Sequence, residues 1–281
     1  MNLEDIKSFT FPGGEIQVVL DDTVPNDGFI YASIRNSDDI IKLLLATDAY
    51  TRKYGHKPEL YLPYIPYARQ DRVANKGESL SIKVFTDLIN SQEYPVVHVL
   101  DPHSDISTAL INNIKVTDST EFAKKVCKQI DINDYTLIAP DAGCLKKVYK
   151  IAKEVGYTGE VVFCEKQRDT VTGNITGTKI YCSILEDKNF ILFDDICDGG
   201  RTFIEIAKIL KANGCNKVIL ATTHGIYSKG LEVMFEYIDE LYCTDSFKEI
   251  DCPSGMKQFN ALNLMQGYDM AQLQKDIRKA V

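Results

Sequence analysis

The stretch ILFDDICDGGRTF, residues 191–203, runs from an apolar segment through two carboxylates and a Gly-Gly turn to a threonine and a helical pattern. Paired glycines allow a tight turn with inward-pointing N–H groups, and a following helix N-terminus adds partial positive charge. The glycines and Thr202 are therefore expected to form a phosphate cradle. Asp194 and Asp195 end the expected strand, where open α/β sheets place ligands, and can bind a ribose diol. An acidic turn before a capped helix is the simpler alternative.

Elsewhere in the chain, short apolar runs rich in β-branched residues alternate with helical patterns, which predicts parallel βαβ units. Several of the runs are apolar throughout, as in a sheet covered on both faces. Helices are expected over 145–155 and 203–213, each followed by a glycine. The sequence thus predicts an α/β protein with mostly parallel sheets flanked by helices. The expected strands are 16–20, 29–34, 59–62, 96–100, 135–139, 160–164, 190–193 and 217–221.

The length and composition of the chain indicate a folded protein of two domains. It has 281 residues, of which 44% are hydrophobic and 26% charged, and a domain takes roughly 100 to 200 residues. From the strand count, a boundary is expected between residues 116 and 134, and we divide the chain into lobes 1–123 and 124–281.

Charge and hydropathy exclude several classes of partner. Lys and Arg number 32 and Asp and Glu 40, a net charge of -8, and no dense basic run is present, so no nucleic-acid partner is expected. The N-terminus has no signal-peptide pattern, and no stretch reaches the roughly 20 apolar residues of a membrane span. We therefore expect a cytoplasmic protein without a membrane partner. Eight scattered cysteines without zinc-ligand spacing are expected to be reduced thiols.

Residues 191–203 resemble the phosphoribosyl-binding loop shared by type I phosphoribosyltransferases and ribose-phosphate diphosphokinases. The second family is favoured, because further segments resemble its motifs in the same order over nearly the whole chain. A phosphoribosyltransferase would share only the cradle, and is the more distant alternative. These segments are FPGGE (11–15), LPYIPYARQDR (62–72), LDPHS (100–104), PDAG (140–143), CEKQRD (164–169) and ATTHGIYS (221–228).

The resemblance implies two phosphoribosyltransferase-like lobes, ATP binding by the first and ribose-phosphate binding by the second. The implied reaction moves the β,γ-diphosphoryl group of ATP to the anomeric 1-hydroxyl of ribose 5-phosphate, with AMP leaving. A homo-oligomer built from dimers, with a hexamer as one form, is implied as well. Two alternatives stay open: the same transfer to a larger 5-substituted ribose such as ADP-ribose, in NAD metabolism, and a non-catalytic regulatory homologue.

The ATP-binding residues implied by the resemblance lie in two segments. Arg69 and Arg72 can meet phosphate oxygens, and Gln70 offers an amide to the base or ribose. In the adenine-side loop, Phe11 is expected to stack and Glu15 to bind. A solvated loop is the alternative for the arginine segment.

A Mg²⁺ site is implied at the ends of two predicted strands. Asp101 and His103 leave an apolar strand on the same side, which suits a Mg²⁺ that keeps several waters and rests on nucleotide phosphates; His103 is counted with the ATP site too. Asp141 is a further candidate ligand. Taken alone, His103 could be a structural histidine and Asp141 a helix N-cap.

The implied catalytic residues are Lys166 and Arg168, two apart on an extended loop, where they would project the same way over the transferring phosphates. Such cations stabilise the charge that develops in phosphoryl transfer. A solvated charged loop is the alternative reading of EKQRD. A non-catalytic homologue would be expected to lose this pair and the metal ligands, and this chain has all of them.

The ribose-phosphate loop departs from the pattern usual in the family, Asp-Thr-Gly-Gly-Thr, by having a glycine in place of the first threonine and an arginine in place of the second glycine. Arg201 could hold a monophosphate more firmly or serve an acceptor with a diphosphate, such as ADP-ribose. The residues assigned to the acceptor are Asp194, Asp195, Asp198, Gly199, Gly200, Arg201 and Thr202.

Overall fold

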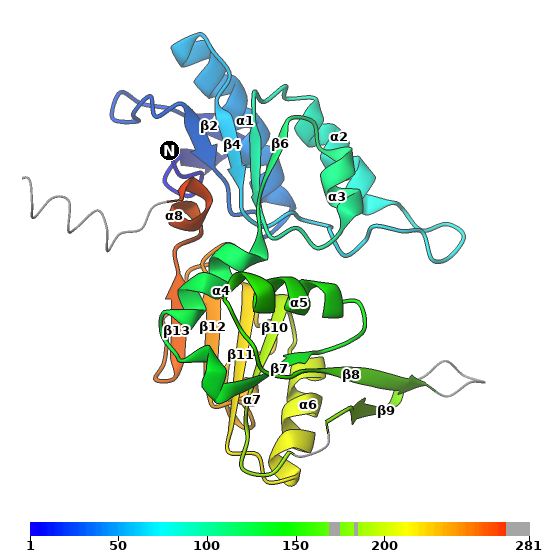
Figure 1. Cartoon of the computed structure of the whole chain (residues 1–281). Coiled ribbons are helices and arrows are strands. Elements are labelled where there is room, and N and C mark those ends of the chain that lie inside the picture. Colours follow the sequence, from blue (N-terminus) through cyan, green and yellow to red (C-terminus); the bar gives the residue numbers. More distant parts are fainter. Residues whose placement is uncertain (169–174, 183–184, 268–281) are drawn as a thin grey trace, which may run out of the picture. The chain divides into compact units, whose positions relative to one another are not determined.

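The computed structural model describes residues 1–168, 175–182 and 185–267 (Figure 1), and only the backbone of 166–168, 175 and 176. Its contacts separate two compact units. Unit 1 comprises Met1–Thr117, Ser246–Lys248 and the described residues from Asn260 on; unit 2 comprises Asp118–Asp245 and Glu249–Phe259. The lobe boundary after residue 123 stays a prediction.

Unit 1 contains a four-stranded parallel sheet in the order β3-β4-β5-β6 and a separate antiparallel hairpin, β1-β2. Apolar side chains of the sheet and of residues 40–50 and 82–89 form the main core, and a smaller cluster joins Tyr31, Tyr61 and Leu100 of the sheet to Ala261 and Met265. The strands are β1 Lys7–Thr10, β2 Ile16–Val19, β3 Phe29–Tyr31, β4 Glu59–Leu62, β5 Val97–Leu100 and β6 Ile114–Thr117; the helices are α1 Ser37–Tyr54, α2 Ser81–Asn90, α3 Asp105–Leu110 and α8 Ala261–Gln266.

The sequence defines both ends of α1. The Asn36 side chain accepts a hydrogen bond from the Asp39 N–H at 3.0 Å, which satisfies one of the unpaired donors of the first turn. Gly55 ends the helix in the left-handed region, with φ of 77°, where a glycine has no steric penalty. One face of the helix, including Leu43 and Tyr50, is buried in the core.

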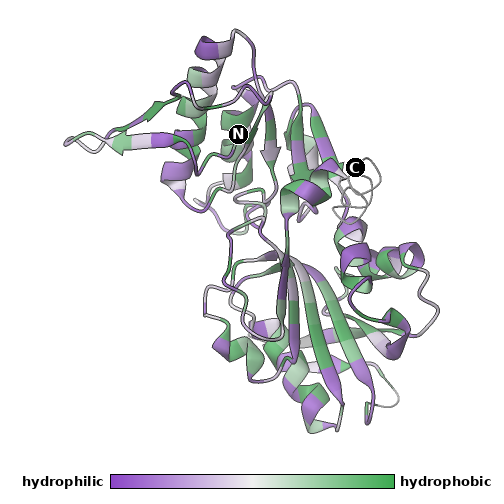
Figure 2. Cartoon of the chain, turned by 90° about the vertical axis from the view of Figure 1, so that its left-hand side faces the viewer, coloured by the Kyte–Doolittle hydropathy of each residue, from purple (hydrophilic) through white to green (hydrophobic). Residues whose placement is uncertain are grey.

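Unit 2 contains a seven-stranded sheet in the order β13-β12-β11-β10-β7-β8-β9, parallel except for the β8-β9 pair. Figure 2 shows hydrophobic residues along its central strands. The strands are β7 Tyr135–Ala139, β8 Val161–Arg168, β9 Ile175–Ile180, β10 Asn189–Cys197, β11 Lys217–Gly225, β12 Glu240–Thr244 and β13 Met256–Phe259. The helices are α4 Ser119–Cys127, the 3₁₀ turn η1 Ile132–Asp134, α5 Leu145–Glu154, α6 Arg201–Ala212 and α7 Glu232–Phe235.

The expected fold class is confirmed, but several strand ends were predicted wrongly. The strands expected over 160–164 and 217–221 continue to Arg168 and Gly225, and the strand expected over 29–34 ends at Tyr31. The strand expected over 190–193 continues to Cys197, so Asp194 and Asp195 lie inside β10 and not after it. The extension is stable because β11 is equally long and pairs with β10 up to Gly225. Two consecutive carboxylates are depleted in strands, and this is why the sequence suggested an earlier end.

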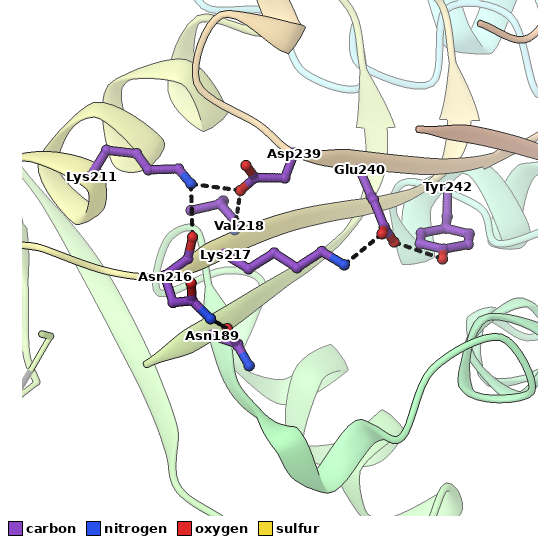
Figure 3. A network of polar contacts seen from close by, with 8 residues as sticks. All are labelled: Asn189, Lys211, Asn216, Lys217, Val218, Asp239, Glu240 and Tyr242. Carbon is purple, nitrogen blue, oxygen red and sulfur yellow. Dashed lines mark hydrogen bonds and ion pairs between the residues drawn. The ribbon is translucent and has the colours of Figure 1, made fainter. Parts of the chain in front are cut away.

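A polar network fixes the amino-terminal ends of β10, β11 and β12 (Figure 3). The Asp239 carboxylate accepts hydrogen bonds from Lys211 Nζ and from the Val218 N–H, both at 2.7 Å, and Lys217 Nζ lies 2.5 Å from Glu240 Oε1. These contacts join the start of β11 to the start of β12 and to the last turn of α6. They lie at the edge of the sheet opposite to the carboxyl ends of its strands, where α/β proteins bind ligands.

Candidate functional site

The cradle is the turn that joins β10 to α6. Gly200 stands at the N-terminus of the helix with φ of 74°, and a Cβ there would come 2.2 Å from the Met234 sulfur. Glycine is therefore required at this position both by backbone conformation and by space. The first helical hydrogen bond runs from the Ile204 N–H to the Gly200 carbonyl at 3.0 Å, which leaves the preceding N–H groups of the helix for an anion.

Two neighbouring carboxyl groups precede the cradle. The Asp195 N–H donates to Asp194 Oδ1 at 2.9 Å, and the Asp195 side chain is buried. Burial, together with the adjacent charge of Asp195, raises the pKa of Asp194 well above its usual value. The two carboxylates repel each other when both are charged. A hydroxyl donor or a cation bound to the pair would reduce this repulsion, so the pair suits a ribose diol.

The start of α5 contacts this acid pair. The Cys144 thiol lies 3.2 Å from the Phe193 carbonyl oxygen and 3.5 Å from Asp194 Oδ1, and its own N–H donates to Asp141 Oδ1 at 3.1 Å. Asp141 thus accepts a backbone hydrogen bond in the turn before α5, but the N-cap of the helix is Cys144 and not Asp141. Metal binding by Asp141 stays a prediction. Burial raises the pKa of the Cys144 thiol, which is therefore protonated and can donate.

The sequence did not assign Cys144 to the site, because a single cysteine three residues after an acid has no distinctive pattern. The sequence indicated the loop after β11 only as far as residue 228, because the residues that follow have no distinctive pattern either. The Ile226 and Tyr227 N–H groups donate to the Cys197 carbonyl at 2.9 and 3.2 Å, and the Ser228 N–H donates to the Asp198 carbonyl at 3.2 Å. These bonds hold the loop beside the cradle.

The two side chains after the glycines differ in their surroundings. Thr202 is half-buried in the first turn of α6. Arg201 is 84% exposed, and its Nε lies 2.9 Å from Glu205 Oε1, one turn further along the helix. The assignment of Arg201 to an acceptor phosphate stays a prediction.

The expected catalytic residues lie at the end of β8. The backbone of Lys166 pairs with Thr178 and that of Arg168 with Ile175, with an irregularity in register between Gln167 and Arg168. The segment is thus a strand in an antiparallel pair rather than a loop. The side chains of Lys166 and Arg168 lie outside the described residues, so their catalytic role stays a prediction.

In unit 1, the expected ATP-binding arginine segment follows β4, and the expected metal-binding segment follows β5. These strands are parallel neighbours, and the carboxyl ends of such strands meet at one edge of a sheet. Arg69, Gln70 and Arg72 are exposed on the loop after β4. Asp101 directly follows β5 and is buried, while His103 is exposed. The structure thus brings the arginine segment and two of the three expected metal ligands, Asp101 and His103, to the same edge of this sheet, whereas Asp141 belongs to unit 2.

Asp101 is held in an unusual backbone conformation. Its φ of 39° is in the left-handed region, and its N–H donates to the Thr117 carbonyl of the neighbouring chain segment at 2.9 Å. Such strain in a residue with a Cβ is common at functional sites, since the surrounding structure must maintain it.

The adenine-side loop lies elsewhere in unit 1. Phe11 and Glu15 form the hairpin tip, where the Phe11 N–H donates to the Glu15 carbonyl at 2.8 Å and the Phe11 ring packs edge-on against Phe9 at 5.0 Å between centroids. The hairpin and the loop after β4 project from opposite sides of unit 1 (Figure 1). The structure does not bring Phe11 together with Arg69 within this unit.

Across the described ranges, no group of three or more His, Cys, Asp and Glu side chains could hold a metal ion by itself. A buried carboxylate at Asp101 and an imidazole two residues later fit a Mg²⁺ bound mainly by water and nucleotide phosphates, since Mg²⁺ seldom has an all-protein cage.

Two parts of the chain match models of known protein families. Residues 109–252, slightly more than half of the chain, match the family described as phosphoribosyl transferase domain. Residues 1–92 match the N-terminal domain of ribose phosphate pyrophosphokinase, a synonym of ribose-phosphate diphosphokinase. The chain therefore belongs to the ribose-phosphate pyrophosphokinase family.

Individual relatives agree over most of the chain. The ribose-phosphate pyrophosphokinases of Mycoplasmopsis pulmonis and Thermotoga maritima are each 28% identical to this chain over 94% of its length, and 83% and 86% of those proteins are covered. The crystal structure of phosphoribosylpyrophosphate synthetase from Mycobacterium smegmatis superposes with a TM-score of 0.77 at 22% identity, covering 96% of this chain and 90% of that one. The last comparison establishes the shared fold.

In the part of the chain that the structure describes, no helix combines the length and the apolar character that crossing a membrane requires.

Proposed function

We propose that this chain is a ribose-phosphate diphosphokinase. The 1-hydroxyl of ribose 5-phosphate attacks the β-phosphorus of ATP in line, the bond to the bridging α,β-oxygen breaks, and AMP leaves with the bonding electrons as the hydroxyl loses its proton. The products are phosphoribosyl diphosphate and AMP.

The observation that carries this proposal is the presence of both family domains, in order, on one chain. A phosphoribosyltransferase uses a cradle like that at Gly199 and Gly200 but has no need of an ATP-binding segment. This chain has Arg69 and Arg72 after β4, and Asp101 at the end of β5, on the edge where parallel sheets bind ligands.

Unit 2 supplies the acceptor side of the reaction. The N–H groups at the start of α6 bind the 5-phosphate, and Asp194 and Asp195 bind the ribose hydroxyls. Lys166 and Arg168 neutralise the transferring phosphates. The resulting division of labour gives the nucleotide to unit 1 and the sugar to unit 2.

Asp101 and His103 would hold a Mg²⁺ together with the ATP phosphates, and Asp141 is a candidate for a second metal ion or its water shell. When bound, the ion neutralises the phosphate oxygens as the β-phosphorus is attacked. We also propose a cytoplasmic location and a homo-oligomer built from dimers, as the family resemblance implies.

Ribose 5-phosphate is the acceptor we favour, since the relatives are ribose-phosphate pyrophosphokinases and no comparison points to ADP-ribose or to a non-catalytic homologue. The test is a nucleotide-release assay with ATP, Mg²⁺ and either ribose 5-phosphate or ADP-ribose. AMP release with ribose 5-phosphate alone supports the proposal; release only with ADP-ribose contradicts the acceptor, and release with neither contradicts the activity.

A further inference from the structure

Gly199 is a glycine for a different reason from Gly200. Its backbone is not in the left-handed region, so its conformation is open to other residues. A Cβ at Gly199 would instead come 3.2 Å from Cγ and 3.8 Å from Cε of Lys229, and 3.7 Å from Ser228 Oγ. The missing side chain leaves room for the Lys229 stem, which lies across the cradle.

The position of Lys229 is set by the backbone. The preceding residue, Ser228, donates its N–H to the Asp198 carbonyl at 3.2 Å. The following residue, Gly230, has φ of 86° and donates its N–H to the Tyr227 carbonyl at 3.0 Å, which closes a turn. The lysine is thus carried by a turn that is bonded to the cradle itself.

Lys229 differs in its pairing from the other cation of the cradle. Arg201 is directed along α6 to Glu205. Among the residues that the structure describes, no carboxylate forms an ion pair with the Lys229 ammonium. A phosphate monoester next to the carboxylates of Asp194 and Asp195 needs a compensating positive charge, and a lysine supplies one as a compact, flexible cation.

We propose that Lys229 binds the 5-phosphate of the acceptor sugar, with its stem packed over Gly199. This assignment rests on the proposed function for the identity of the sugar phosphate, and it adds a binding residue to that site. Because the contact holds a group remote from the reacting 1-hydroxyl, it affects acceptor binding more than the chemical step.

The test compares Lys229→Met, which keeps most of the stem, with Lys229→Arg, which keeps the charge. Lys208→Met is the matched control, because Lys208 lies on the same unit with its ammonium over the Tyr237 ring, 4.5 Å from the ring centroid. Two quantities are measured: the Kd of ribose 5-phosphate by calorimetry without ATP, and the KM and kcat of AMP release. Unphosphorylated ribose is titrated in parallel.

We expect Lys229→Met to raise the Kd and KM for ribose 5-phosphate about 10-fold, as for loss of one charge-assisted hydrogen bond, with kcat and the KM for ATP changed less than about twofold. Lys229→Arg should restore most of the affinity, and Lys208→Met should match the wild type. Ribose binding should not respond to any variant. An unchanged Kd for ribose 5-phosphate in Lys229→Met overturns the proposal.

Gly199→Ala provides a second, independent variant, since the added Cβ displaces the lysine stem. It should weaken ribose 5-phosphate binding in the wild type but add little in the Lys229→Met background, because both changes remove the same contact. Additive losses would contradict the packing of Lys229 over Gly199. If the wild type releases no AMP but binds ribose 5-phosphate through Lys229, the proposed function fails and the Lys229 site stands.

Discussion

The Cys144 thiol lies 3.5 Å from Oδ1 of Asp194, and so a side chain at the start of α5 contacts a carboxylate of β10. The same oxygen accepts the Asp195 N–H at 2.9 Å. One oxygen of Asp194 is thus oriented by the protein. Cys144 is in this sense a positioning residue for the acid pair that we assign to the ribose.

Removing this thiol should weaken acceptor binding. Loss of a hydrogen bond worth about 1 kcal/mol predicts a KM for ribose 5-phosphate about fivefold higher in Cys144→Ala, with a smaller effect on kcat. Cys144→Ser, which keeps a donor, should recover most of the loss. The control is Cys215→Ala, another buried thiol. Equal kinetics for Cys144→Ala and wild type would remove Cys144 from the site.

The raised pKa of Asp194 predicts that the stability of the protein depends on pH. Its pKa is raised above 3.8, so the folded protein binds this proton more tightly than the unfolded chain does. The free energy of unfolding therefore falls as pH rises from about 3.8 through the raised pKa. Asp194→Asn removes this loss, so its Tm should exceed that of the wild type by an amount that grows with pH. Thermal unfolding across this pH range measures it, and a Tm difference independent of pH contradicts the electrostatic cause.

The network in Figure 3 predicts a change in stability without a change in activity. Asp239→Ala leaves the Val218 N–H without its acceptor and Lys211 Nζ with only the Asn216 carbonyl, which should lower the free energy of unfolding by about 1 to 2 kcal/mol. Denaturant unfolding measures this loss. Glu236→Ala, whose carboxylate contacts the neighbouring Tyr237 hydroxyl, should cost less. A large fall in kcat for Asp239→Ala would mean that this edge of the sheet communicates with the site.

Lys166 and Arg168 are expected to act on the transferring phosphates. Lys166→Ala and Arg168→Ala should each lower kcat by about 10²-fold or more, while the KM for the sugar changes little, because their contacts strengthen in the transition state. Steady-state AMP release measures both constants. Turnover like that of the wild type in both variants would refute the assignment.

The sequence predicted the fold class correctly but not every strand end. Apolar runs rich in β-branched residues indicated the strands, and glycines indicated where α5 and α6 end. The extension of β10 through Asp194 and Asp195 was not predictable, since it depends on pairing with β11. Strand counting likewise cannot indicate that α8 returns to unit 1, where Ala261 packs with residues of β3, β4 and β5.

Site residues were predicted where a local pattern carries the chemistry, as in the Gly-Gly turn before α6, and their roles stay predictions. Lys229 was not predicted, because its contact with Gly199 depends on hydrogen bonds between the loop after β11 and the carbonyl groups of Cys197 and Asp198, which are distant in the sequence. The sequence indicated that Arg201 places a positive charge near the cradle. In the structure its side chain points to Glu205, four residues further along the helix, and the sequence-based prediction did not consider this ion pair.

The central claim, diphosphoryl transfer, is tested most directly by following the β-phosphorus of ATP. ATP labelled at that atom is incubated with the enzyme, Mg²⁺ and ribose 5-phosphate, and the products are separated. If the diphosphoryl group is transferred, the label leaves the nucleotide completely and appears in the sugar product in equal amount to unlabelled AMP. Label retained in ADP would show transfer of the γ-phosphoryl group alone, and label retained in ATP would show no transfer; either result contradicts the account.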